Sequence, residues 1–332
     1  GLRESVGGDG RVAMNSLTRA LSVHGTGDRT RLLPDTPEAV TALLCLHSGE
    51  LAHAAAALGR PSTVPSVRHR LLAAWTALIG GVLPVATAAA DELAPSATEQ
   101  RDQLFLHGLR VGLARRGGDV GALTAAWTAA QGVVAAYSVD LLSLLPLGEL
   151  WLAAVRCGEA DRIAHLVARA RELLSTLGEP PLWGATLHWY GVQAAIAADR
   201  PAELLPHARA LGSAAESTAY AAALARAGQA WLRVLQGDAD PARVQAAAES
   251  LAAIGLPWDG ARLAGEAALR VGDTATATAL LQVARAVRHP SAAPRSPAPA
   301  PAAAAPTAPS PLSDREAEVA DLVVAGLTYR EV

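Results

Sequence analysis

The sequence predicts an all-α protein built from a series of helical hairpins. Hydrophobic residues make up 51% of the 332 residues, but alanine supplies much of this share and aromatic residues only 4%. Small side chains allow helices to pack closely, whereas sheet cores are rich in aromatic and β-branched residues. A short turn pattern also returns along the chain at a nearly regular interval. Because the chain is longer than one ordinary core, this interval indicates a repeat array.

The returning pattern is a glycine followed by an acidic residue, placed between two stretches with helical spacing of apolar residues. Successive turns lie roughly 32 to 40 residues apart, which is the period of helical-hairpin repeats. The glycine can end the first helix, and the acidic residue favours the positive N-terminal end of the second. The pattern occurs at Gly49-Glu50, Gly118-Asp119, Gly158-Glu159, Gly237-Asp238 and Gly272-Asp273, and more weakly at Gly80-Gly81 and Ala198-Asp199.

Residues 35–287 are therefore expected to form one repeat domain. A single hairpin cannot bury its apolar face alone, so the hairpins stack into a curved superhelix with a concave surface. Segments such as 48–52 and 272–277 resemble tetratricopeptide repeats with a degenerate consensus. This resemblance implies an α-solenoid of tetratricopeptide-like helical hairpins. Residues 1–34 are expected to be an N-terminal remnant, irregular to helical.

The composition changes sharply after the repeats. Residues 288–311 consist largely of proline and alanine and contain no aromatic side chain. Such a segment cannot bury enough apolar area to order itself, so a disordered linker is predicted, extended where prolines cluster.

Residues 312–332 contain two helix starts. Ser313 to Glu316 has the spacing of a capping box, and the following helix carries apolar residues on one face. Gly326 is the expected stop, and Thr328 to Glu331 is a second capping box. A helix, a short glycine-containing turn and a new helix is the local plan of a helix-turn-helix.

These tail residues resemble the beginning of the LuxR-type DNA-binding domain. The agreement covers Leu312, Ser313, Arg315, Glu316, Glu318, Val319, Leu322, Val323, Ala325, Gly326, Leu327, Thr328, Arg330, Glu331 and Val332. Two positions depart from the family pattern: Ala320 replaces the usual leucine, and Tyr329 the common asparagine. The resemblance implies DNA-backbone contacts by Arg315, Thr328 and Arg330 in the complete domain.

The same resemblance indicates that the base-reading helix follows Val332, so this chain is expected not to bind DNA specifically. Large LuxR-type regulators carry a helical-repeat sensor before the DNA-binding domain, often with an ATPase upstream. The resemblance therefore implies DNA as a partner of the complete parent protein only. ATP would be a cofactor only through an upstream domain that is not present here.

Several other functions are excluded or disfavoured by the sequence. Lysine does not occur, which excludes a Walker A loop, and no zinc-protease, nucleophile-elbow or C-x-x-C motif is present. A net charge of -3 provides no basic field for nucleic acid. No apolar run reaches about 18 residues. We expect no catalytic site, no metal site and no membrane partner, with Cys45 and Cys157 as reduced thiols and a cytoplasmic location.

Scarce aromatic residues gather in the second half of the repeat region and indicate an effector site. Trp189 and Gln193 stand four apart and share a helix face, whereas His188 and Tyr190 are expected to project elsewhere. A pocket is predicted on the concave side, between the repeats at about 140–190 and 215–265. Trp183, Trp189 and Trp258 would be its stacking surfaces, and Gln193, Asp259 and Arg262 its hydrogen-bonding groups. The alternative is that these tryptophans only fill gaps between alanine-rich helices.

The hypothesis for function is a sensor and signal-transmission region. An effector such as a sugar, or a protein partner, would bind the concave surface of one state better than another and so control the DNA-binding domains. The alternative is a peptide- or protein-docking scaffold without a small-molecule ligand. An enclosing pocket favours the first and an open polar groove the second, while pairing of two copies is left open.

Overall fold

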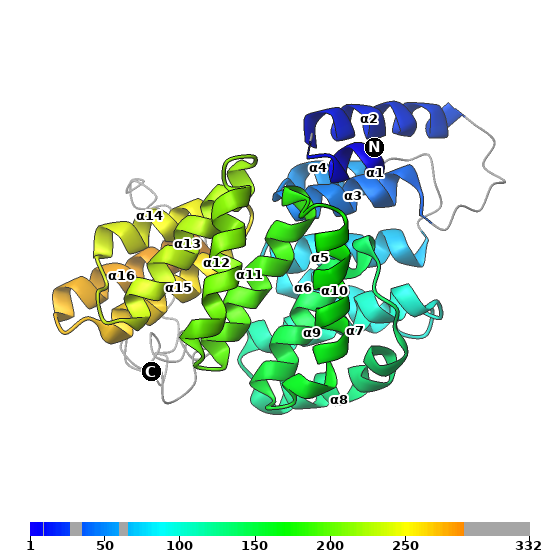
Figure 1. Ribbon diagram of the computed structural model, residues 1–332. Helices are drawn as coiled ribbons and strands as arrows, with labels where there is room; N and C mark the ends of the chain where they lie inside the picture. Colours follow the sequence, from blue (N-terminus) through cyan, green and yellow to red (C-terminus); the bar gives the residue numbers. More distant parts are fainter. Residues whose placement is uncertain (9, 27–34, 60–65, 289–332) are drawn as a thin grey trace, which may run out of the picture.

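The described part of the protein is entirely helical. The computed structural model describes residues 1–8, 10–26, 35–59 and 66–288 (Figure 1). These ranges contain sixteen α-helices and two 3-10 helices, η1 (Leu141–Ser143) and η2 (Ala160–Arg162), and no strand. The all-α prediction is confirmed. Within the same ranges, no helix has both the length and the apolar character needed to span a bilayer.

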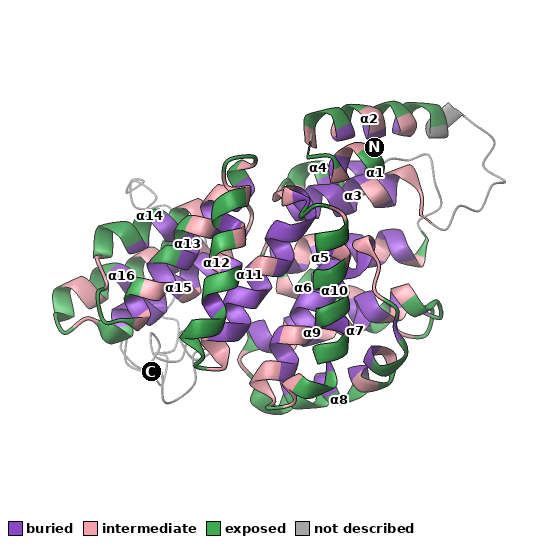
Figure 2. Ribbon diagram, in the orientation of Figure 1, coloured by how far each residue is buried: buried purple, intermediate pink, exposed green. Residues whose placement is uncertain are grey.

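Seven helices form an inner set, in which each helix packs against the next member. They are α3 (Pro37–Ser48), α5 (Val67–Ile79), α7 (Gln100–Gly117), α9 (Leu144–Arg156), α11 (Pro181–Ala197), α13 (Ala219–Leu235) and α15 (Pro257–Arg270). Figure 2 shows the difference in burial clearly for α11, which is mostly buried, and its neighbour α12, which is mostly exposed.

Each inner helix is followed along the chain by an outer helix that packs against it. The outer helices are α4 (Leu51–Leu58), α6 (Leu83–Leu93), α8 (Val120–Ala136), α10 (Ala164–Thr176), α12 (Pro201–Ala214), α14 (Pro241–Ala253) and α16 (Thr274–Arg288). All seven predicted turns separate an inner helix from its outer partner. Gly49 and Gly118 close their helices at φ 78° and 75°, and Asp119 accepts a hydrogen bond from the Ala122 amide at 3.0 Å.

The two ends of the helix series meet. The α3–α4 turn lies against the turn between α14 and α15: a Cβ added to Gly49 would lie 2.4 Å from the Ile254 carbonyl oxygen. A Cβ added to Gly255 would lie 2.9 Å from the Leu51 side chain. Helix α3 also contacts α11 directly. Because of this closure, the inner helices surround one shared interior.

The Gly49→Ala substitution is expected to weaken this closure. Gly49 and Gly237 both adopt a positive φ, at 78° and 79°, but only Gly237 has no described atom within 4 Å of an added Cβ. Gly237→Ala should cost about 1–2 kcal/mol of backbone strain. Gly49→Ala should cost a further ~1–3 kcal/mol, since the added methyl group meets the Ile254 carbonyl. Equal losses for the two variants in urea titrations would contradict the closure.

Two further helices precede the inner and outer sets. Helix α1 (Leu2–Val6) packs on α11, and α2 (Gly10–Thr26) packs on α3. The indole Nε1 of Trp183 donates to the Ser5 hydroxyl at 2.9 Å, which ties α1 to the middle of the chain. Cys45 and Cys157 are free thiols. Residues 289–332 lie outside the described residues, and with them most of the predicted linker and the whole predicted helix-turn-helix segment.

Candidate functional site

The inner helices converge on a small central cavity with a volume of about 20 Å³. This volume holds about one water-sized group. All seven inner helices, or the residue directly before them, contribute to its wall. The lining residues are Leu46, Ile79, Arg115, Arg116, Leu145, Thr186, Trp189, Tyr190, Gln193, Tyr220, Leu256 and Asp259.

Glu149 is held at this centre by two arginines. Arg115 donates to both carboxylate oxygens at 3.0 and 2.9 Å, and Arg116 donates to Oε1 at 2.7 Å. The Tyr190 hydroxyl donates to the same oxygen at 3.1 Å. Burial alone would raise the pKa of Glu149, but the two guanidinium groups overcome this effect and lower it to about 2. The carboxylate therefore stays ionised at neutral pH.

Gly148 makes room for this arrangement. A Cβ at residue 148 would lie 2.0 Å from the ring of Tyr190. Because Gly148 has no side chain, the Tyr190 ring can approach α9 closely and its hydroxyl reaches Glu149.

A second chain of polar contacts joins α11 to α15. Gln193 Nε2 donates to Asp259 Oδ1 at 2.6 Å, and Arg262 Nη1 donates to Gln193 Oε1 at 2.5 Å. Desolvation, followed by the nearby Arg115 and Arg156 charges, lowers the pKa of Arg262 to about 10. Below we call Arg115, Arg116, Glu149, Tyr190, Gln193, Asp259 and Arg262 the central cluster.

Tryptophan rings pack against the arginines of the central cluster. The Arg115 guanidinium lies 4.5 Å from the centre of the Trp258 ring, and the Arg262 guanidinium lies 5.2 Å from that of Trp231. Such cation–π contacts favour a cation that has lost its water. The Nε1 atoms of Trp189, Trp231 and Trp258 have no hydrogen-bond partner among the described residues, although all three side chains are buried.

The structure brings together five of the six predicted site residues. Trp189, Gln193 and Asp259 line the cavity, and Arg262 and Trp258 contact this group. Gln193, Asp259 and Arg262 are already hydrogen-bonded to one another, whereas the indole Nε1 atoms of Trp189 and Trp258 are not paired among the described residues. The clustering of these five residues is a feature of the fold.

Trp183 lies elsewhere. It precedes Trp189 by six residues on α11, which places it about 9 Å along the axis and on another face of the helix. There its ring packs on His47, with ring centres 4.7 Å apart, and its indole donates to Ser5. Trp183 is thus a core residue, as the gap-filling alternative describes.

Sequence reasoning missed four members of the central cluster. Arg115, Arg116 and Glu149 were not identified, and Tyr190 was expected to project away from the Trp189 face. The last expectation is wrong, because α11 is buried on nearly all sides and Tyr190 lines the same cavity. The available signal was Glu149 itself: an ionised residue inside an apolar run requires a buried partner.

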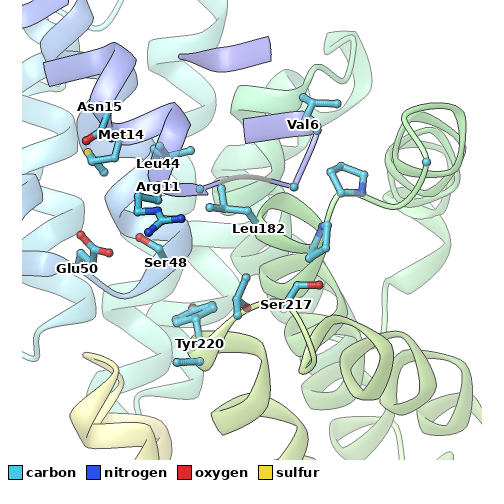
Figure 3. Close-up of a pocket in the computed structure, with 18 residues that line it drawn as sticks. Val6, Arg11, Met14, Asn15, Leu44, Ser48, Glu50, Leu182, Ser217 and Tyr220 are labelled. Atoms are coloured by element: carbon cyan, nitrogen blue, oxygen red, sulfur yellow. The ribbon is translucent and has the colours of Figure 1, made fainter. Parts of the chain in front are cut away.

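A much larger open groove lies beside this centre. Its volume is about 1010 Å³, and Figure 3 shows side chains of α2 and α3 facing those of α11 and the start of α13. Its lining combines apolar residues with polar ones such as Arg11, Asn15, Ser48 and Glu50. Tyr220 lines both the groove and the central cavity, so this residue separates them.

The buried histidines include His47 on α3 and His207 on α12. The His47 ring is fully buried, with Nδ1 3.1 Å from the Thr186 hydroxyl, and burial lowers its pKa to about 3. The Nδ1 atoms of His188 and His207 lie 3.0 Å apart. Burial, then His188 and Arg171, lower the pKa of His207 to about 4. Among the described residues, no group of three or more His, Cys, Asp or Glu side chains is placed to hold a metal ion.

The predicted DNA-contacting residues Arg315, Thr328 and Arg330 lie outside the described residues. No protein family model, no curated protein and no solved structure matches this chain.

Proposed function

We propose that this chain is the sensor and signal-transmission portion of a LuxR-type transcription regulator. In this proposal, residues 35–287 are an α-solenoid of tetratricopeptide-like hairpins, 288–311 a disordered linker and 312–332 the start of the DNA-binding domain. The agreement of residues 312–332 with the LuxR pattern supports the regulator. The alternation of inner and outer helices supports the solenoid.

The observation that carries the sensor role is the open groove beside Tyr220. Its volume of about 1010 Å³ is at the upper end of the usual range for small-molecule sites, roughly 300–1000 Å³. The central cavity, at about 20 Å³, has no room for a sugar. We therefore place the effector in the groove. The predicted residues Trp189, Gln193, Trp258, Asp259 and Arg262 then form the rigid polar wall behind Tyr220.

The position of the groove offers a mechanism for transmission. One wall comes from α2 and α3, and the other from α11 and α13, which follow more than a hundred residues later. A ligand that contacts both walls stabilises the spacing of the walls that fits it best. Binding then shifts the population between two arrangements of the helices. The shift is passed to the DNA-binding domain through the C-terminal end of α16, which precedes that domain in the chain.

Filling the groove tests this proposal. We expect mass spectrometry of the purified chain to identify a copurifying small molecule. Ala219→Trp places a bulky ring in the groove at the first turn of α13, where residue 219 is exposed. This variant should bind the molecule about tenfold more weakly in calorimetric titrations, since overpacking costs about 1–3 kcal/mol and a tenfold loss corresponds to ~1.4 kcal/mol.

The matched control is Ala242→Trp, which changes an exposed alanine in the first turn of α14 outside the groove. This control should bind like the parent chain. Unchanged affinity of the Ala219→Trp variant would remove the groove from the proposal.

The groove also favours the second candidate, a peptide-docking scaffold. It is open, and its wall contains loop backbone at 7–8, 178 and 217–218 that can pair with an extended peptide. For this candidate, no small molecule would copurify, and Ala219→Trp would instead abolish capture of a peptide from a random library.

The regulator proposal assigns the protein to the cytoplasm. In that proposal, Arg315, Thr328 and Arg330 contact DNA only in the complete domain.

A further inference from the structure

The atoms left unpaired around the central cavity are of one kind. Among the described residues that line it, the buried side-chain atoms without a hydrogen-bond partner are Arg115 Nη1, Arg116 Nε and Trp189 Nε1. All three are donors, and their residues are no more than 3% exposed. A buried donor without an acceptor costs roughly 1–3 kcal/mol, and more when it carries a charge. The site therefore fits an occupant that accepts hydrogen bonds.

The charge of the central cluster indicates the sign of that occupant. Four guanidinium groups, of Arg115, Arg116, Arg156 and Arg262, and three carboxylates, of Glu149, Asp259 and Glu266, interact around this centre. The formal charge is thus +1 when all seven groups are ionised. A water molecule would accept the donated hydrogen bonds but would leave this charge uncompensated.

The positive charge of the central cluster affects the pKa values of Glu149 and Arg262. The pKa of Glu149 is lowered to about 2, so its carboxylate cannot take up a proton to change the balance at neutral pH. The pKa of Arg262 is lowered, first by desolvation and then by the charges of Arg115 and Arg156. Asp259 is the carboxylate in the cavity wall, and its Oδ1 accepts a hydrogen bond from Gln193, which reduces its repulsion of an anion.

The cavity size limits the anion. About 20 Å³ corresponds to one water-sized group, so a phosphate, a sulfate or a sugar acid does not fit. We propose that the central cavity binds one monatomic anion of the size of chloride or bromide, held by Arg115 and Arg116 of α7 and by the indole of Trp189 of α11. The anion joins these helices from inside the closed fold. This site is separate from the open groove, from which Tyr220 divides it.

Halide dependence of stability tests the proposal. At constant ionic strength, the midpoint of thermal unfolding should rise when sodium gluconate is replaced by sodium chloride or bromide, because only the folded state holds the anion. Sodium acetate should behave like gluconate, since a carboxylate exceeds the cavity. An equal effect of acetate would overturn the monatomic assignment. Identical midpoints in all four salts would overturn the proposal.

Two matched variants locate the effect. Trp189→Phe removes the donor in the cavity wall and keeps an aromatic ring, whereas Trp231→Phe removes an equally buried and unpaired indole N–H that does not line the cavity. The midpoints of both variants in gluconate establish that they fold. Halide affinity, measured from the concentration dependence of the midpoint, should fall about tenfold or more in Trp189→Phe, since a hydrogen bond to a charged group is lost. It should be unchanged in Trp231→Phe.

Bromide diffraction gives a readout without any substitution. Crystals grown in sodium bromide should show an anomalous peak between the Arg115 and Arg116 guanidinium groups and the Trp189 indole. Density without anomalous signal at this place would identify a water molecule and overturn the proposal. Equal loss of halide affinity in both tryptophan variants would also overturn the assignment of the site.

Discussion

Glu149→Gln is expected to lower the free energy of unfolding by about 3–5 kcal/mol, the usual result of removing one partner of a buried ion pair. The Glu149 carboxylate has no exposed surface and accepts hydrogen bonds from two arginines whose side chains are 2% and 3% exposed. Without its charge, both guanidinium groups stay buried with no ionic partner. Urea titrations followed by tryptophan fluorescence would measure the loss.

The matched control is Glu172→Gln. Glu172 accepts a hydrogen bond from Arg169 at 2.7 Å, but both side chains are more than 60% exposed. Exposed pairs contribute about 0–1 kcal/mol, so this variant should unfold almost like the parent chain. If Glu149→Gln also lost less than ~1 kcal/mol, the guanidinium groups of the central cluster would have to regain contact with water in the variant. The cluster would then not organise the inner helices.

Acidification is expected to destabilise the protein strongly between pH 6.5 and 4.5. In the unfolded chain, histidine takes up a proton near pH 6.5. In the folded protein, burial lowers the pKa of His47 to about 3 and that of His207 to about 4. Below pH 6.5 the unfolded state therefore binds more protons than the folded state, so stability falls with pH. Two such groups lower the free energy of unfolding by about 2.7 kcal/mol per pH unit, roughly 5 kcal/mol over this window.

The pH slope distinguishes these histidines from other groups. His47→Gln should lower the number of protons taken up on unfolding in this pH window by about one, because the buried neutral His47 is then absent. Above pH 6.5 the stability should be nearly flat with respect to His47 and His207. Below about pH 4.5 Glu149 adds to the loss, since its folded pKa of about 2 lies below its ordinary value. A slope that is the same in His47→Gln and in the parent chain would contradict a neutral buried His47.

The local elements were predictable because their causes are local. A glycine that closes a helix, or an aspartate that caps one, acts through backbone groups a few residues away, as Gly118 and Asp119 do. The seven turn positions could therefore be read from short stretches of sequence. The spacing of Trp189 and Gln193 also placed them correctly on one helix face, since four residues complete about one turn.

The central cluster was only partly predictable, because it depends on closure of the whole helix series. Arg115 reaches Glu149, 34 residues later, and Gln193 reaches Asp259, 66 residues later. Trp183 illustrates the opposite error: proximity in sequence to Trp189 suggested a shared site, but the two rings leave α11 on different faces.

The sequence by itself determined the helical class, the positions of the turns and the resemblance of residues 312–332 to a LuxR-type domain. These depend on composition and on patterns within a few residues. Only the tertiary structure decided which inner faces meet and which charges are buried together. Contact of the Gly49 turn with Ile254 brings α3 against residues two hundred positions later, and no local pattern encodes that contact. The interior charges follow from it, because the free energy of a buried arginine depends on partners that only the closed fold supplies.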